Sequence, residues 1–218
     1  MSFKQEVLNL NNFRVDGRKL LDIRFLDYSI HDNNLYYNQG LTKLKLNLSN
    51  VTSTTQQLNI NINTLNNNLS RNVLDNLISN LKSTFTSVIK YKYALNINID
   101  LINLDGNLLS TLINSTSVLL LLNGIELTDI TVSSSVGLFN QNYLIDLNNF
   151  EELNCNFITI ASLPNLNQIS LINLDSKFHH QNFQHILDLA LESNKLLRTQ
   201  ILLIINKELR YLNKKLII

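Results

Sequence analysis

The chain has 218 residues and a mass of 25.0 kDa, a size that one globular domain accounts for. Its 18 basic and 17 acidic residues leave a formal charge of +1, which excludes a strongly basic nucleic-acid binder, so any contact with RNA needs a local patch. The single cysteine, Cys155, excludes an intramolecular disulfide and a zinc site built from several cysteines. No apolar run reaches the length of a membrane span, and we expect a soluble, intracellular chain.

Alternating apolar and polar residues predict strands in the first half of the chain. Leu44 to Leu48 show the pattern of a half-buried strand, and His31 to Asn34 reads as a hairpin turn before it. The same alternation recurs over 58–62 and 95–101. About one residue in six is asparagine, a composition that also fits disorder or aggregation. Its alternation with leucine and isoleucine favours ordinary strands.

Helical spacing of apolar residues predicts three helices. The first follows Ser70, a suitable cap, and the second runs from about 108 to 123, where Gly124 suits the end. A long final helix spans about 180–212, with a weak point at Ser193-Asn194. Further strands are expected near 128–139, 155–163 and 168–175. Without a linker or an internal repeat, residues 1–218 are predicted to form a single α+β domain in which helices cover a mixed β-sheet.

Only five glycines occur, and their surroundings are more informative than the composition. Glycine tolerates positive φ and close backbone approach, so a chain with so few should keep them where the geometry needs them. The five segments are Arg14-Val15-Asp16-Gly17-Arg18, Asn38-Gln39-Gly40-Leu41-Thr42-Lys43, Leu104-Asp105-Gly106, Asn123-Gly124-Ile125-Glu126 and Ser135-Val136-Gly137-Leu138.

Further segments extend this series toward the carboxyl end. They are Leu144 to Glu152, Leu163-Pro164-Asn165-Leu166-Asn167-Gln168 and Leu174 to His180, with Ile23-Arg24 and Asn114 in the first half. Read in order, the segments resemble the RNase PH family, and most of all the RNase-PH-like ring subunits of the eukaryotic RNA exosome. Among these, the first glycine segment and residues 163–168 are most similar to the counterpart of the archaeal catalytic subunit.

The resemblance covers nearly the whole chain and implies the RNase PH fold, an α+β fold of the ribosomal protein S5 domain 2-like type. It implies a six-membered ring with other RNase-PH-like exosome subunits, S1/KH-type cap proteins and an associated hydrolytic exoribonuclease. RNA would be the molecule that the assembly handles, with no cofactor and no membrane. The implied location is the nucleus and nucleolus, and also the cytoplasm.

Active relatives use inorganic phosphate to attack the last phosphodiester of an RNA 3′ end. This reaction needs a cation and backbone amides for phosphate, carboxylates, and a basic channel for RNA. The phosphate-binding arginine on their first long helix is best matched here by Lys82, which lacks the bidentate fork of arginine. Their Gly-Thr/Ser-Arg turn reads Gly106-Asn107-Leu108, so its hydroxyl and its arginine are both absent.

The acidic motif of active relatives is also incomplete. Asp146 matches its first aspartate, and Glu152 stands at the second with a side chain longer by one methylene; a displacement near ~1 Å can cost on the order of 10²-fold in rate. Leu153 to Asn156 replace a further aspartate, and Ser49 to Leu58, a basic loop in active relatives, contains no lysine or arginine. These losses predict a catalytically inactive subunit. Its relic acidic positions are Asp146 and Glu152, and its weak phosphate- or RNA-binding positions are Lys82, Gly106 and Asn107.

Plainer interpretations stand beside these roles. Asp146, Glu151 and Glu152 could instead cap a turn or lie solvated. Lys82 could be an ordinary exposed helix residue. Cys155, without a base near it in sequence, reads as a buried and inert thiol.

The histidines and the basic clusters have plain interpretations as well. His179, His180 and His185 lack the spacing of a metal site and are expected at the start of the last helix. The charged residues of the first motif, Arg14, Asp16 and Arg18, form either an internal ion-pair cluster or a surface for a neighbouring subunit. A solvated basic face is the plain interpretation of Lys43, Lys45, Lys90 and Lys92.

Two rival hypotheses stay open on the sequence alone. The chain could be an active phosphate-dependent 3′→5′ exoribonuclease, which would release nucleoside diphosphates from RNA. It could also be an unrelated intracellular α+β domain whose motif matches arose by chance, in which case its structure would lack the paired β-α-β halves of the RNase PH fold.

Overall fold

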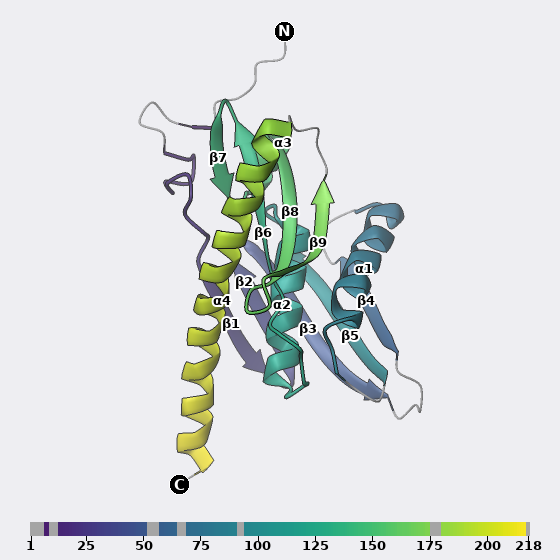
Figure 1. Cartoon of the computed structure of the whole chain (residues 1–218). Helices are drawn as coiled ribbons and strands as arrows, with labels where there is room; N and C mark the ends of the chain where they lie inside the picture. Colours follow the sequence, from purple (N-terminus) through teal and green to yellow (C-terminus); the bar gives the residue numbers. More distant parts are fainter. Residues whose placement is uncertain are drawn as a thin grey trace.

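The computed structural model describes residues 7–8, 13–51, 57–64, 69–90, 94–174 and 180–216, which form two β-sheets with helices packed on them (Figure 1). In chain order the elements are β1 (Leu26–His31), β2 (Asn34–Gln39), β3 (Thr42–Val51), β4 (Leu58–Thr64), α1 (Arg71–Thr86), β5 (Ala94–Asn103), α2 (Leu108–Leu122), β6 (Val132–Phe139), β7 (Asn142–Ile145), α3 (Asn149–Asn154), β8 (Asn156–Leu163), β9 (Gln168–Leu174) and α4 (His180–Leu216). None of the helices in these ranges is long and apolar enough to cross a bilayer.

The first sheet has the strand order β1-β2-β3-β5-β4, with β4 and β5 parallel and the other pairs antiparallel. A parallel pair needs a crossover connection, and α1 lies in that connection and packs on β4. One face buries residues such as Ile97. On the other face, asparagines of β4 and β5 pair across the strands, with Asn59 donating to Asn96 (2.9 Å) and Asn61 to Asn98 (3.0 Å). The asparagine-rich segments therefore form ordinary strands, as predicted, and their asparagines pair across the two strands.

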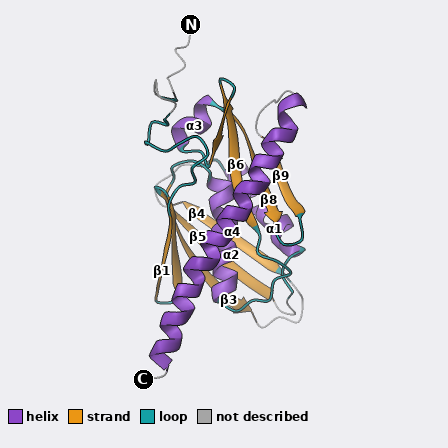
Figure 2. Ribbon diagram, turned by 60° about the vertical axis from the view of Figure 1, so that its left-hand side comes forward, coloured by secondary structure: helices purple, strands orange, loops and turns teal. Residues whose placement is uncertain are grey.

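The second sheet is antiparallel and has the order β7-β6-β8-β9. The first part of α4 packs on it and buries Ile186 and Ala190 against Val136 and Ile160. Beyond this contact α4 runs on past α2 and β1 of the first sheet (Figure 2). One long helix thus covers parts of both sheets.

α2 lies between the two sheets, in contact with β3 on one side and with β6 and β8 on the other, and every residue over 109–120 is buried. Its leucines form an apolar body, whereas Ser110 and Asn114 lie on one face at helical spacing. Ser110 Oγ donates to Ser133 O (2.6 Å), and Asn114 Oδ1 accepts from Ser133 N (2.8 Å). Since β7 pairs with β6 only over 136–139, these side chains satisfy backbone groups in the earlier part of β6.

The predicted helices and long strands are confirmed, and so is the fold class. The mixed sheet of the prediction is the first of two sheets, and the hairpin turn falls at Asp32 and Asn33, both with positive φ. Two short elements, β7 and α3, have no counterpart in the prediction because four and six residues are too few to show a period.

The weak point predicted at Ser193-Asn194 is wrong. α4 is continuous through both residues, and both are buried. The Asn194 amide donates to Ile160 O (3.1 Å) and to Ser162 Oγ (2.9 Å), both in β8. The polar residue therefore attaches the helix to the second sheet instead of interrupting it.

We predict that Gly106→Ala destabilises the protein more than Gly124→Ala. Both glycines have a left-handed backbone, with φ of +71° and +67°, so the conformational cost of alanine is similar at the two positions. A Cβ at Gly106 would lie 2.4 Å from the backbone carbonyl carbon of Asn148, whereas a Cβ at Gly124 meets no atom within 4 Å. Urea unfolding should show an additional loss of about 1–3 kcal/mol for Gly106→Ala. Equal losses would contradict the close approach of the α2 and α3 starts.

Candidate functional site

Asp146 follows β7 directly, and its side chain is fully buried. Its backbone is left-handed, with φ of +55°, a region that aspartate enters more readily than most residues. Its N–H donates to Ser135 O (2.9 Å), which ties the turn to β6. The first acidic position of the predicted motif is therefore an interior residue.

Five donors converge on the Asp146 carboxylate. Arg24 provides its backbone N–H (2.8 Å to Oδ2), Nε (3.1 Å to Oδ1) and Nη2 (2.9 Å to Oδ1). Gln39 Nε2 (3.1 Å) and Asn107 Nδ2 (2.5 Å) also donate to Oδ1. The carboxylate thus joins the segment before β1, the end of β2 and the start of α2.

The Arg24 guanidinium keeps Asp146 ionised in the interior. Burial alone would raise the pKa of Asp146, but the charge of Arg24 and its hydrogen bonds outweigh burial and hold that pKa below its usual value. Arg24 Nη1 donates to Asp105 O (2.6 Å), and a Cβ at Gly40 would lie 2.6 Å from Arg24 Cδ. Arg24 is therefore enclosed by the fold, and its positive charge pairs with the Asp146 carboxylate.

A second buried ion pair lies next to the first. Arg14 is fully buried and pairs with the buried carboxylate of Glu151, with Nε donating to Oε1 at 2.7 Å. Its other nitrogens donate to Ile145 O (2.6 Å) and Asp146 O (3.0 Å). Glu151 also forms a capping box with Asn148 at the start of α3. Glu151 therefore caps the start of α3. Asp146 and Glu151 are both buried, so the interpretation that they lie in solvent is wrong for these two residues.

The charged residues of the first glycine motif pair within the chain. Arg18 Nε donates to Asp16 Oδ2 (2.7 Å), and Arg18 Nη1 donates to Asp146 O (3.0 Å). Gly17, with φ of +84°, makes the turn in which its N–H donates to Arg14 O (2.9 Å). The internal ion-pair cluster, one of the two interpretations that the sequence left open, is therefore present in the structure.

The turn predicted to bind phosphate, Gly106-Asn107-Leu108, lies at the start of α2, but the backbone N–H of Asn107 already donates to a carboxylate. Asn107 has a left-handed backbone, with φ of +52°, and its N–H donates to Glu152 Oε1 at 2.6 Å. A backbone N–H at a helix N-terminus is the kind of donor that holds a phosphate oxygen. In this chain the Glu152 carboxylate holds that donor instead.

A cavity of about 490 Å³ lies beside this turn, between α1 and the start of α2. Asparagines line much of it, among them Asn76 and Asn80 of α1 and Asn107 of the turn. Of the described residues that line it, Glu152 is acidic and none is basic. The half-buried Lys82 does not line the cavity, because it follows Asn80 by two residues and so lies about 200° around the helix. The structure brings Asn107 and Glu152 together here and leaves Lys82 outside.

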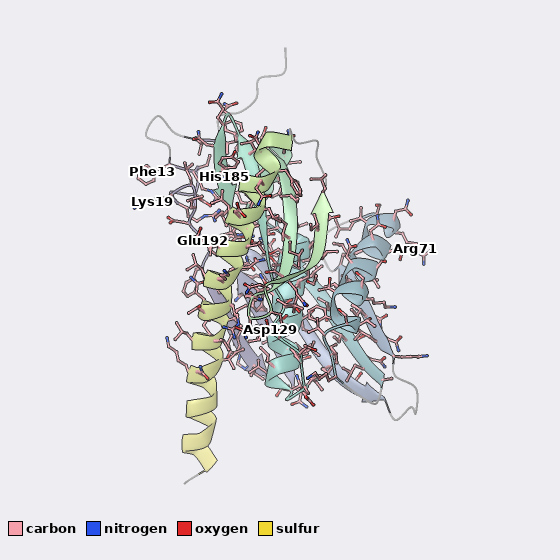
Figure 3. The ribbon with its side chains drawn as sticks, viewed as in Figure 1. Phe13, Lys19, Arg71, Asp129, His185 and Glu192 are labelled. Carbon is pink, nitrogen blue, oxygen red and sulfur yellow. The ribbon has the colours of Figure 1, made fainter. Side chains whose placement is uncertain are left out.

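The predicted histidine and cysteine positions lie elsewhere. His185, labelled in Figure 3, packs its ring against Tyr143 with centroids 4.6 Å apart. His179 is outside the described residues, and only the backbone of His180 is described. No group of three or more potential metal ligands occurs in the described ranges. Cys155 is buried, as predicted.

Apart from the buried Arg14 and Arg24, described basic side chains are spread over the surface. Lys45 pairs with Asp100 (3.8 Å) and Lys90 with Glu126 (3.7 Å). Figure 3 shows Lys19 and Arg71 on opposite sides of the molecule. Lys92 and half of the loop predicted to have lost its basic residues, namely 52–56, lie outside the described residues.

Sequence analysis missed the roles of Arg24, Gln39 and Asn148. Arg24 and Gln39 lie within the resembling segments, but their partner Asp146 is 122 and 107 residues away along the chain and leaves no signal in local spacing. Asn148 and Glu151 do have the spacing of a capping box, which could have located α3.

We predict that Asp146 makes the stability of the protein depend on pH in acid. Its pKa is lower in the folded than in the unfolded state, so its contribution is present above the ordinary aspartate value of about 4 and is lost as the pH falls below it. Asp146→Asn should cost about 3–5 kcal/mol at neutral pH, because Arg24 stays buried without its charge partner. The variant should also lose less of its remaining stability than the wild type on going from about pH 5 to pH 3. Thermal unfolding at several pH values checks this, with the exposed Asp188→Asn as control; equal acid dependence in the wild type and Asp146→Asn would contradict it.

Known proteins with similar sequences support the relationship that the residues suggested. The family model for the 3′ exoribonuclease family, domain 2, matches residues 129–193. The exosome complex component RRP41 homolog of Arabidopsis thaliana is 32% identical over 108 residues, which are 49% of this chain and 45% of that protein. The chain thus spans about half the length of this relative. The exosome complex component SKI6 of Saccharomyces cerevisiae is 22% identical over 214 residues, covering 85% of this chain and 87% of that protein.

The fold agrees with these matches. The crystal structure of rice (Oryza sativa) Rrp46 is similar with a TM-score of 0.76, at 17% identity, over 86% of this chain and 98% of that chain. At this identity the likeness establishes the fold, which is the RNase PH fold. The hypothesis of an unrelated α+β domain with chance motif matches is therefore wrong. Residues 129–193 thus match the 3′ exoribonuclease family, domain 2, within a chain that has the RNase PH fold.

Proposed function

We propose that this chain is a non-catalytic subunit of an RNA exosome ring. In that role it supports 3′→5′ processing and degradation of RNA, including rRNA processing and mRNA decay, by threading RNA to a separate nuclease. The observation that carries the proposal is the Glu152 carboxylate on the backbone amide of Asn107. The exosome proteins among its relatives support the assembly.

Phosphorolysis requires a phosphate held against the last phosphodiester bond by positive charge and free N–H donors. At the start of α2 the Asn107 amide donates to Glu152, and the described lining of the adjacent cavity contains no basic side chain. A phosphate there would meet a carboxylate in place of a guanidinium. Repulsion between two unit charges about 4 Å apart amounts to about 1–4 kcal/mol for effective dielectric constants between about 80 and 20. The site therefore disfavours the first step of the reaction.

Asp146 is a poor candidate for the acid chemistry of an active relative. A general acid must carry a proton near neutral pH, whereas Arg24 holds the pKa of Asp146 below its usual value. The carboxylate is fully buried and already accepts hydrogen bonds from Arg24, Gln39 and Asn107. These contacts favour a structural role for Asp146.

Exposed apolar side chains favour a role in assembly. Phe25 and Leu203, 81% and 58% exposed, line a groove of about 640 Å³ between the edge strand β1 and α4. At the other end of the molecule the edge strand β9 exposes Ile172 and Leu174. Edge strands and apolar patches of this kind are surfaces that proteins usually cover. Other RNase-PH-like subunits of a six-membered ring are the proposed neighbours, with S1/KH-type cap proteins and a hydrolytic exoribonuclease as further partners. The proposed location is the nucleus and nucleolus, and also the cytoplasm.

We expect the tagged chain, purified at its native level, to bring down the other RNase-PH-like proteins of the ring, as identified by mass spectrometry. RNA decay by the purified complex should run equally fast with and without inorganic phosphate, because the nuclease is hydrolytic. The opposite result is a chain purified alone that releases nucleoside diphosphates only with phosphate, and that loses this activity in a folded Asp146→Asn variant. It would establish the active phosphorolytic exoribonuclease instead.

We also expect the isolated chain to self-associate and to become soluble on co-expression with a ring partner, as measured by light scattering. Phe25→Ser combined with Leu203→Ser should reduce recovery of the partner several-fold without lowering the melting temperature, because both side chains are exposed in the folded chain. Leu41→Ser is the matched control, since Leu41 is 64% exposed in the β2–β3 turn, away from the groove. A well-behaved monomer, or equal losses in the variant and the control, would count against the assembly.

A further inference from the structure

The strand β4 forms an open edge of the first sheet. The strand order ends at β4, and β1 forms the opposite edge (Figure 1). α1 packs on one face of β4 and covers its apolar residues, among them Ile60 and Ile62. β4 has the sequence Leu-Asn-Ile-Asn-Ile-Asn-Thr, without a charged residue or a proline, whereas proteins usually protect an edge strand with such residues. In the described part of the chain, β5 is the one strand that pairs with β4.

The backbone groups of β4 point alternately to the two sides of the strand. Leu95 N–H donates to Gln57 O at 2.9 Å, at the start of the parallel pairing of β4 with β5. In such a pair, alternate residues of a strand bond with the neighbouring strand. The odd-numbered residues of β4 therefore direct their N–H and C=O groups to β5. The even-numbered residues, including Ile60 and Ile62, direct theirs away from the sheet, where a further strand would bond with them.

The side-chain amides of β4 supply a second row of donors and acceptors along the same edge. Asn59, Asn61 and Asn63 lie on its exposed face, and each donates through Nδ2 to a side chain of β5. Asn63 donates to a carboxylate, that of Asp100, which fixes the orientation of its amide because an ionised carboxylate is only an acceptor. Each of the three amides still has an oxygen and a second N–H. No described residue donates to those oxygens.

We propose that β4 pairs with β4 of a second copy of this chain, antiparallel and about a two-fold axis at Asn61. In this register Asn61 lies opposite Asn61 of the partner subunit, Asn59 opposite Asn63, and Ile60 opposite Ile62. The hydrogen-bonded pairs are then formed by the even-numbered residues, whose backbone groups point outward. The asparagines meet in the closer, non-hydrogen-bonded pairs, where each amide faces an amide that both donates and accepts.

A second copy is the occupant because the edge is complementary to itself. Asn61 is the middle residue of β4, so this register pairs the whole strand with its copy, whereas any shifted register leaves part of it unpaired. The strand is uncharged, so no like charges oppose each other across the axis. Two-fold pairing also closes on itself, and it covers the β4 edges of both copies. Because β1 is the opposite edge of the sheet, the pairing leaves the groove between β1 and α4 free and does not depend on the proposed ring.

Cysteines introduced into the full chain test the pairing and its register. Asn61→Cys should form a disulfide-linked dimer under mild oxidation, because opposite residues of a non-hydrogen-bonded pair have Cα atoms about 4.5 Å apart, within the range of a disulfide. Asn59→Cys and Asn63→Cys should each stay unlinked alone and should cross-link when the two variants are mixed. Ser49→Cys, exposed on the same face but in β3, is the matched control and should not cross-link. The native Cys155 is buried.

Light scattering on the isolated chain should give twice the 25.0 kDa of one copy. Asn61→Lys places like charges opposite each other and should weaken the dimer about fivefold, without lowering the melting temperature because Asn61 is exposed. Ser49→Lys adds the same charge two strands away and should change nothing.

Three results would overturn the proposal: a monomeric chain, no disulfide in Asn61→Cys, or equal masses for Asn61→Lys and Ser49→Lys. Association that survives Asn61→Lys but is lost in the Phe25→Ser, Leu203→Ser variant would place the contact at the groove and overturn it as well. A failure of the proposed ring is read separately, from the proteins that co-purify.

Discussion

The buried charge of Asp146 is the constraint on which both the fold and the site depend. A carboxylate can stay ionised in the interior only where an opposite charge and enough donors accompany it. Arg24, Gln39 and Asn107 meet that requirement, and they come from the segment before β1, from β2 and from the start of α2. The contacts that stabilise the Asp146 charge therefore hold the first sheet, α2 and the end of β7 in a single arrangement. The backbone oxygen of the same residue accepts from Arg14 and Arg18, so the N-terminal motif is tied to that point as well.

The same contacts determine what the site can do. The residues that resemble a phosphorolytic site have their hydrogen-bonding capacity used within the chain: Asp146 by Arg24, and the Asn107 amide by Glu152. The described lining of the cavity beside Asn107 has one acidic side chain, that of Glu152, and no basic one. A surface built to hold phosphate would show the reverse, with donors and positive charge exposed. This reversal is the physical basis for proposing an assembly role.

Much of the fold could be predicted from the sequence, because periodicity reports which face of each element is buried. The asparagine–leucine alternation located β4 and β5, and the glycine segments in order indicated the RNase PH fold. The contacts of the interior could not be predicted, since Arg24 and Asp146 are distant in sequence. Lys82 illustrates a second limit. It lies on α1, but two residues after Asn80 and so about 200° around the helix from the cavity lining, and its predicted contact with phosphate or RNA stays a prediction.

Glu152 supports one conclusion when it is read from the sequence and a different one when its contacts in the structure are known. From the sequence, glutamate in place of aspartate is a carboxylate displaced by one methylene, and the displacement reads as a loss of catalytic geometry. In the structure the carboxylate lies 2.6 Å from the Asn107 amide, a contact that satisfies a donor at the start of α2. An anion and this carboxylate cannot hold the same N–H group at once. Since the described residues lining the cavity include no cation to recruit a phosphate, the internal carboxylate stabilises the helix start without competing for a ligand. The Glu152 contact and the lack of a basic side chain in the described lining are therefore two parts of one arrangement that disfavours an anion.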